Sequence, residues 1–295
     1  MIKYIVDIDE VGFRLDASIV ARLSVLSRAS VQKLCKQKLV KVNGEIPKIS
    51  YRLRLGDEVV VDYDVDAVQI IPEIDLPILY EDDDCVVINK PVGLLTHSKG
   101  AFNPEATVAT WLEPKLTQDL PASQKEEHHS RSGIVHRLDR ATSGVMICAK
   151  NPEALSWLQK QFSERRTKKT YVAIIQGVME PEKAVIDMPI ERNPKKPQTF
   201  RVGPNGKPSI TAYEVMQVSN EHTMLKLSPT TGRTHQLRVH LNFLKKPIVG
   251  DLMYEGQSAD RLFLHALSLE ITLPNRKRRV FKAPLPDEFK TFMND

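Results

Sequence analysis

The charge of this chain changes sign abruptly near residue 60, and this change constrains the possible folds more than any other feature. Nine basic side chains and a single acid, Glu45, lie between Arg22 and Arg54. Nine acids and no Lys or Arg follow between Asp62 and Asp84. Basic clusters separated by acidic stretches favour a track for a polyanion over a uniformly basic surface. We therefore expect a compact basic module at the N-terminus and a separate, larger second domain.

Composition narrows the class of protein. A length of 295 residues suits two domains. No apolar run approaches the roughly 20 residues that span a bilayer, and the N-terminus lacks the apolar core of a signal peptide. The three cysteines lie far apart without paired spacing, so neither a disulfide framework nor a zinc site is expected, and a reducing cytoplasm is the expected location.

Three further basic clusters lie later in the chain, at residues 165–169, 192–207 and 276–282. Each cluster alone is explained by a solvated face. Together with the basic N-terminal stretch they favour a nucleic acid as the partner, and phosphate contacts of this kind give an affinity that falls steeply with salt.

Residues 1–66 predict two short helices followed by a hairpin. Asp16 is a possible N-cap of the first helix and Ser27 of the second, and Asn43–Gly44 is a strong hairpin turn signal. The apolar positions at helical spacing are Leu15, Ile19, Leu23, Leu26, Val31, Leu34 and Cys35. The basic side chains that the second helix offers to folded RNA are Arg28, Lys33 and Lys36.

This stretch resembles the small RNA-binding module shared by a small-subunit ribosomal protein, tyrosyl-tRNA synthetases and several rRNA-modifying enzymes. The resemblance rests on residues 14–16 (Arg-Leu-Asp), 27–30 (Ser-Arg-Ala-Ser) and 40–44 (Val-Lys-Val-Asn-Gly). One departure is Lys38, where the family usually has Gly. If the backbone needs a positive φ at that position, Lys38 carries strain.

Residues 67–77 hold two prolines and no clear period, which predicts an acidic linker. Over residues 78–295 short strand-like runs dominate, and the chief helical pattern is Pro152–Phe162. We expect an α+β domain built on a mixed, largely antiparallel sheet. The predicted strands include Cys85–Ile88, Val145–Ala149, Tyr171–Ile175, Ile210–Val218 and Met224–Leu227. Neither a glycine-rich phosphate loop nor a dinucleotide fingerprint occurs, so no cofactor is expected.

Residues 133–144 read Gly-Ile-Val-His-Arg-Leu-Asp-Arg-Ala-Thr-Ser-Gly. If this segment is extended, its two-residue period places Arg137 and Asp139 on one side, and Ile134 and Leu138 on the other, toward a core. An adjacent guanidinium keeps a carboxylate ionised and holds it in place. The ordinary alternative is a surface Asp entering a turn.

Three more segments carry polar residues that a simple core would not require: residues 89–97, 168–177 and 231–240. Lys90 begins a rigid turn, Tyr171 shares a strand face with Ala173 and Ile175, and Thr234 could cap a helix that contains Arg238. Each has an ordinary alternative, namely a simple turn, a core tyrosine and an arginine that reaches solvent along an apolar stripe. The histidines His136, His235 and His240 lack a Cys or Glu at ligand spacing, so no metal site is expected.

Taken together, these segments resemble the RluA-type family of RNA pseudouridine synthases over nearly all of residues 78–270. The runs at 136–139 (His-Arg-Leu-Asp) and 232–240 (Gly-Arg-Thr-His-Gln-Leu-Arg-Val-His) are highly specific in this order. Further matches are Lys90-Pro91-x-Gly93, Lys169-x-Tyr171-x-Ala173, and Pro247 to Asp251 with Tyr254. The chief departure is Ala141, where the family often has an acid, and we expect it to affect the turn more than the chemistry.

The resemblance implies an isomerase that converts uridine in RNA to pseudouridine. It makes Asp139 the essential carboxylate, Arg238 its ion-pair partner, Tyr171 the residue that stacks on the target base, and Arg137 the side chain that fills the space of the flipped-out base. Further residues expected to bind substrate are His136, Lys90, Leu237 and Arg233, together with Arg28, Lys33 and Lys36 of the N-terminal module. The reaction needs no cofactor. A monomer acting on large-subunit (23S) ribosomal RNA is expected, with tRNA as the alternative.

Two other functions compete with this interpretation. A non-catalytic RNA-binding or ribosome assembly protein would need no ionised Asp139, and the absence of Asp139, Tyr171 or Arg238 would have favoured it. A hydrolase of RNA glycosidic bonds usually works with two carboxylates, and no second acid occurs in the four segments. We therefore expect the isomerase.

Overall fold

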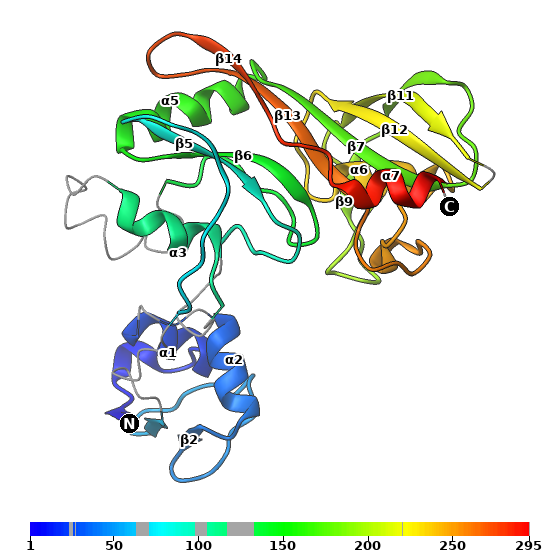
Figure 1. The fold of residues 1–295 in the computed structure, drawn as a ribbon. Helices are drawn as coiled ribbons and strands as arrows, with labels where there is room; N and C mark the ends of the chain where they lie inside the picture. Colours follow the sequence, from blue (N-terminus) through cyan, green and yellow to red (C-terminus); the bar gives the residue numbers. More distant parts are fainter. Residues whose placement is uncertain are drawn as a thin grey trace. The chain divides into compact units, whose positions relative to one another are not determined.

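A computed structural model describes residues 1–23, 26, 28–62, 71–97, 105–116, 133–219 and 221–294, except for the side chain of Ala29. The chain divides into two compact units (Figure 1), of which the first comprises residues 1–73 with 97–106 and the second residues 74–96 with 107–295. The predicted boundaries at residues 66 and 78 stay predictions, because residues 63–70, including part of the predicted linker, lie outside the described part. Among the described residues, no helix combines the length and apolar character that crossing a bilayer requires.

The first unit packs two helices on a small antiparallel sheet of strand order β1-β3-β2. Its elements are β1 (Ile2–Ile5), the 3-10 helix η1 (Ile8–Glu10), α1 (Leu15–Arg22), α2 (Arg28–Lys36), β2 (Val40–Val42) and β3 (Glu58–Val61). The predicted stripe residues Leu15, Ile19 and Leu34 are buried in one core. The two predicted helices are therefore present, and they use the predicted apolar faces.

Two local predictions for this unit were wrong in detail. Arg14, not Asp16, is the N-cap of α1, and Asp16 lies in the first turn of the helix. There its carboxylate accepts two 3.0 Å hydrogen bonds from the Arg14 guanidinium. The Asn43–Gly44 turn leads from β2 only to a single bridge at Glu45, and the strand that pairs with β2 is β3. The proposed cap Ser27 lies outside the described residues.

Lys38 has a φ of 62°, in the left-handed region. It ends α2 by donating its N–H to the Cys35 carbonyl at 3.1 Å, while Leu39 donates to the Leu34 carbonyl at 3.0 Å. This turn favours glycine, because a Cβ in the left-handed region meets the following carbonyl. Lys38 therefore carries the strain that its departure from the module's usual glycine predicts.

Replacing Lys38 by Gly is expected to stabilise α2 by about 1 kcal/mol, because it relieves this conformation. Amide hydrogen exchange of α2 in the full chain should slow by about five-fold. The control is Lys33→Gly, which removes the same charge from the interior of the same helix and should accelerate exchange. Equal effects of the two substitutions would show that charge, not conformation, decides the result.

The second unit is built on a nine-stranded sheet in which β6 and β13 pair in parallel and the other pairs are antiparallel. The predicted α+β class is confirmed. The strands are β4 (Ile78–Glu81), β5 (Cys85–Lys90), β6 (Ser143–Ala149), β7 (Lys168–Gln176), β8 (Lys183–Asp187), β11 (Ile210–Val218), β12 (His222–Pro229), β13 (Leu264–Thr272) and β14 (Arg278–Lys282), and a separate ribbon comprises β9 (Ile190–Arg192) and β10 (Phe200–Val202). The helices are α3 (Val108–Leu112), η2 (Glu113–Lys115), α5 (Pro152–Ser163), α6 (Gln236–Phe243), η3 (Leu252–Tyr254) and α7 (Asp287–Asn294).

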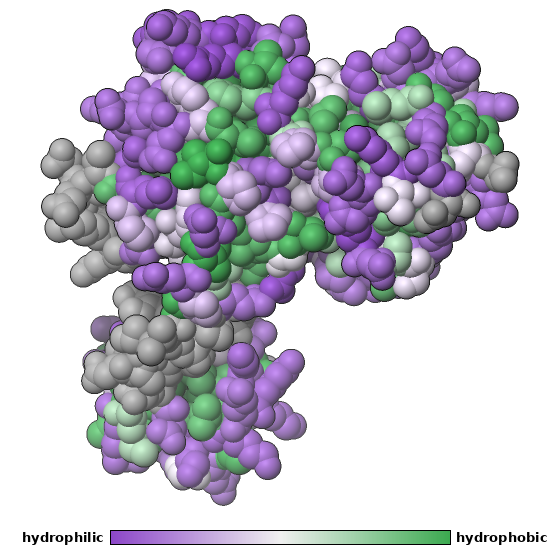
Figure 2. All heavy atoms as spheres, viewed as in Figure 1, coloured by the Kyte–Doolittle hydropathy of each residue, from purple (hydrophilic) through white to green (hydrophobic). Residues whose placement is uncertain are grey.

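The core of this unit lies on both sides of the central strands. The β7 run from Val172 to Ile175 is fully buried, and Leu237 and Leu241 of α6 join the same cluster. A second cluster packs α5 on β6. The turn between β13 and β14 is polar, because residues 275–279, four of them basic, are exposed, and Figure 2 shows hydrophilic residues gathered over this turn at the top of the view.

The close pairing of β6 with β13 requires Gly144. Its φ is 116°, and a Cβ added there would lie 2.2 Å from the Ala266 carbonyl oxygen. The glycine thus lets the start of β6 approach the middle of the sheet. Because β6 begins directly after the turn that follows Asp139, this pairing fixes that turn beside β13 and β7.

Candidate active site

Four segments of the second unit line a pocket with a cavity volume of about 130 Å³. They are residues 137–142, the start of β7, the stretch from the end of β12 into α6, and the first residue of β13. The sequence-predicted residues that line the pocket are Arg137, Asp139, Tyr171, Arg233, Leu237 and Arg238. The fold therefore brings together six of the eight site residues predicted for the second domain.

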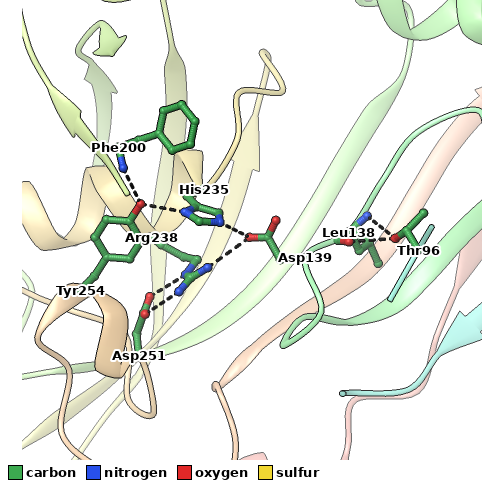
Figure 3. Close-up of polar contacts among 8 residues, drawn as sticks. All are labelled: Thr96, Leu138, Asp139, Phe200, His235, Arg238, Asp251 and Tyr254. Atoms are coloured by element: carbon green, nitrogen blue, oxygen red, sulfur yellow. Dashed lines mark hydrogen bonds and ion pairs between the residues drawn. The ribbon is translucent and has the colours of Figure 1, made fainter. Parts of the chain in front are cut away.

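Asp139 is held through its own backbone and that of its neighbour. Thr96 Oγ1 donates to the Leu138 carbonyl at 2.8 Å and accepts the Leu138 N–H at 3.3 Å (Figure 3). Thr142 closes the turn by donating its N–H to the Asp139 carbonyl at 3.0 Å. Leu138 is buried, whereas Arg137 is exposed and the Asp139 side chain is 20% exposed. The segment is not a regular strand, but it places Arg137 and Asp139 on the pocket side and Leu138 in the core.

Arg238 is held first by Asp251 and only second by Asp139. Its Nε and Nη2 each donate to an Asp251 carboxylate oxygen at 2.7 Å. Its Nη1 lies 3.4 Å from Asp139 Oδ2. The Arg238 and Asp251 side chains are 8% and 1% exposed. The expected pair between Arg238 and Asp139 is present, but the bidentate Asp251 contact fixes the guanidinium.

His235 is the second group that faces the Asp139 carboxylate. Its Nε2 lies 3.8 Å from Asp139 Oδ2, and its Nδ1 lies 2.8 Å from the Tyr254 hydroxyl. That hydroxyl also accepts the Phe200 N–H at 2.9 Å, so Tyr254 holds the imidazole ring in place beside Asp139. Burial lowers the pKa of His235. The ring is therefore neutral at physiological pH, and its Nε2 faces Asp139.

The start of α6 differs from the sequence prediction. His235, with φ of 57°, is the N-cap in place of Thr234 and makes no side-chain cap hydrogen bond. Gln236 organises the preceding loop, because its Oε1 accepts from the Thr231 hydroxyl at 2.7 Å and from the Arg233 N–H at 3.0 Å. The loop therefore holds its shape through Gln236.

Two side chains on β7 face the pocket. Burial, followed by the charge of Asp139, raises the pKa of Tyr171, so this residue stays a neutral phenol at physiological pH. Burial lowers the pKa of Lys169 to about 8. The ammonium of Lys169 donates to the Thr231 carbonyl at 2.9 Å and thereby ties β7 to the loop before α6.

Lys90 and His136 do not line the pocket, in contrast to their expected contact with substrate. Lys90 is fully buried, and its ammonium donates to the carbonyls of Pro91 at 2.9 Å, Leu94 at 2.8 Å and Arg140 at 3.4 Å. These three acceptors match its three donors, while burial lowers its pKa to about 8. Lys90 thus fixes the backbone beside Asp139.

His136 packs inside the unit. Its ring stacks on Phe162 with centroids 4.5 Å apart, and its Nε2 accepts the Ile147 N–H at 3.1 Å. Burial lowers the pKa of His136 to about 3, so the ring is neutral. His240 is similarly structural, bonded to the Thr211 hydroxyl and the Met188 carbonyl.

Four pocket or supporting residues were absent from the sequence-predicted site: Lys169, His235, Asp251 and Tyr254. All four lie in the sequence runs that resemble the RluA-type family. No local pattern indicated that the loop after α6 returns Asp251 to Arg238. In the first unit, the predicted RNA-binding residues Arg28, Lys33 and Lys36 are exposed on α2.

Comparison with known proteins agrees with this geometry. The family described as RNA pseudouridylate synthase matches residues 84–243, and the S4 domain matches residues 13–59. A Borreliella burgdorferi protein named ribosomal large subunit pseudouridine synthase D is 34% identical over 299 residues, covering 98% of this chain and 91% of that protein. An Aquifex aeolicus protein named uncharacterized RNA pseudouridine synthase is 38% identical over 251 residues, covering 83% and 78%.

Solved structures give the same result. The human RNA pseudouridylate synthase domain containing 4 superposes with a TM-score of 0.55 at 28% identity, covering 72% of this chain and 90% of that chain. The human RNA pseudouridylate synthase domain containing 1 gives a TM-score of 0.57 at 27% identity, covering 75% and 86%. With a family match over more than half of the sequence and relatives aligned along nearly all of it, this chain belongs to the RNA pseudouridylate synthase family.

Proposed function

We propose that this protein converts uridine to pseudouridine in large-subunit (23S) ribosomal RNA, with Asp139 as the catalytic carboxylate. The observation that carries the proposal is the position of Asp139 in one pocket with a fixed cation, Arg238, and a half-buried phenol, Tyr171. The names of the relatives, ribosomal large subunit pseudouridine synthase D, support this RNA over tRNA. The exposed basic face of α2, within the S4 domain match, supports binding of structured RNA.

The reaction rearranges bonds within one nucleotide. The bond from the sugar to nitrogen 1 breaks, the base rotates, a bond from the sugar to carbon 5 forms, and the proton of carbon 5 is replaced by one on nitrogen 1. No electrons or groups are gained, so we propose that the protein acts without a cofactor. Attack of the carboxylate on the sugar and removal of the 2′ proton both begin from an ionised Asp139.

The two carboxylate oxygens of Asp139 have different contacts. Arg238 Nη1 and His235 Nε2 both approach Oδ2, at 3.4 and 3.8 Å. Oδ1 has no hydrogen bond or ion pair with any described residue. We assign Oδ1 as the reacting oxygen, with Oδ2 as the anchored one, because an oriented carboxylate loses less entropy on reaching the transition state.

Tyr171 and Arg137 have separate proposed roles. The neutral ring of Tyr171 packs against the target base inside the pocket. Arg137, exposed at the same pocket, fills the space that the extruded uridine leaves in the RNA. Base extrusion costs a few kcal/mol, which favours a target in a loop or irregular stem. We further propose a cytoplasmic monomer.

Mapping pseudouridines in cellular RNA with and without this protein should show the loss of one or more sites in large-subunit ribosomal RNA. These sites should be lost because the proposed reaction takes place only in the pocket that holds Asp139. Loss of a tRNA site with ribosomal RNA unchanged would replace the proposed substrate. Free uracil released by the purified protein would indicate a hydrolase, and an unchanged pseudouridine map would indicate a non-catalytic RNA-binding protein.

A further inference from the structure

We propose that a second hollow in the same unit binds an unpaired nucleotide of the substrate RNA, close in space to the target uridine. The hollow lies between the β9–β10 ribbon, the end of α6 and η3, and its cavity volume is about 300 Å³. This inference rests on the proposed function, because the ligand is part of the same RNA.

The walls of the hollow carry apolar side chains that solvent reaches. Phe243 is 47% exposed and Met253 is 44% exposed, and Phe200 is half-buried beside them. Unpaired bases stack on aromatic rings, and the polarisable methionine thioether makes favourable contacts with aromatic rings. An exposed apolar cluster of this kind is typical of an interaction site.

The rim of the hollow is mainly cationic. Lys196 and Lys245 are exposed there, and Arg201 also lines the hollow while bonded to Glu191 at 2.7 Å. Glu255 is the one acid among the residues that line the described hollow. This excess of positive charge complements a phosphate backbone, so a nucleotide fits better than an apolar protein segment.

Hydrogen bonds within the loop that carries Lys196 hold the backbone of this residue in place. The Asn193 side chain accepts the N–H groups of Lys195 at 3.0 Å and Lys196 at 3.4 Å. Thr199 donates both its hydroxyl and its N–H to the Lys196 carbonyl at 2.8 Å. These bonds fix the backbone from which the Lys196 side chain extends at the rim of the hollow.

The hollow is joined to the active site through Tyr254. Tyr254 lines the hollow, and its hydroxyl bonds both the Phe200 N–H and Nδ1 of His235, the residue that faces Asp139 (Figure 3). A base that packs on Phe200 contacts the residues that orient His235. The nearness of the two sites favours two nucleotides of one RNA over two separate ligands.

The first test is the double variant Phe243→Ala with Met253→Ala, assayed with large-subunit ribosomal RNA transcribed in vitro. Loss of the stacking surface should raise Kd for this RNA about ten-fold. KM should rise in parallel, while kcat at saturating RNA stays within about two-fold, since these side chains touch no reacting atom. Met216→Ala is the matched control, because it removes a 50% exposed methionine from β11, and it should leave Kd unchanged.

The second test removes one positive charge from the rim of the hollow. Lys196→Gln should reduce the slope of log Kd against log salt by about 0.7, the contribution of one single-stranded phosphate. Lys290→Gln, the same change at an exposed position on α7, should leave the slope unchanged. Both substituted lysines are exposed, so thermal unfolding should not change.

The outcomes separate this inference from the function on which it rests. If the wild-type protein forms pseudouridine and neither the double variant nor Lys196→Gln alters RNA binding, the nucleotide site is wrong and the proposed function stands. A hollow that serves a protein partner gives this same result. If the wild-type protein forms no pseudouridine on any RNA, the proposed function itself is wrong.

Discussion

Replacing Asp139 by Ala is expected to abolish pseudouridine formation, lowering turnover by about 10⁴-fold or more. The substitution removes the only proposed reacting group, and the remaining pocket residues supply a cation and a phenol but no carboxylate at that place. Release of tritium from RNA that carries 5-tritiated uridine measures the reaction directly, because the hydrogen on carbon 5 is lost as the new bond forms.

RNA binding and folding should survive this substitution. Asp139 is partly exposed, and Arg238 keeps both of its 2.7 Å bonds to Asp251 when Asp139 is absent. Asp260→Ala, at an exposed position of the same unit, is the control and should keep full activity. Turnover retained in the Asp139 variant would contradict the assignment of Asp139.

Much of the fold follows from local patterns in the sequence. The helix expected over Pro152–Phe162 is α5, and the strand expected over Ile210–Val218 is β11 with the same bounds. Such elements are predictable because the period of their apolar residues reports which face is buried. The αL residue at Lys38 was foreseeable for a related reason, since a usual glycine at that position implies a positive φ.

The site was only partly predictable, because its contacts join distant segments. Asp251 reaches Arg238 across the turn after α6, and Thr96 holds Leu138 from 42 positions earlier. The local pattern of apolar and polar residues does not indicate these contacts between distant positions. Lys90 was misplaced for a different reason, since a lysine at a strand exit normally reaches solvent, and here three carbonyls compensate its burial.

The contacts of Arg238 indicate different roles for the carboxylates of Asp251 and Asp139. Two carboxylates approach one guanidinium, but the contacts are unequal: Asp251 makes two bonds of 2.7 Å, and Asp139 lies at 3.4 Å. The first carboxylate fixes the cation, and the second remains available for chemistry. A buried cation with a permanent partner can support a reacting carboxylate through its whole cycle without itself becoming unpaired.

Replacing Arg238 by Met is therefore expected to affect both stability and activity. It leaves Asp251, which is 1% exposed, as a buried carboxylate without its cation, and the free energy of unfolding should fall by about 3–5 kcal/mol. Denaturant unfolding of the full chain measures this loss. Pseudouridine formation should fall as well, because Oδ2 of Asp139 loses its cationic anchor.

The double variant Arg238→Met with Asp251→Asn separates the two effects. The neutral amide no longer places an unpaired charge in the core, so most of the lost stability should return. Activity should not return, because Asp139 still lacks the guanidinium. A double variant that regained activity along with stability would show that Arg238 acts only through the fold, and a single variant as stable as the wild-type protein would show that Asp251 does not depend on this cation.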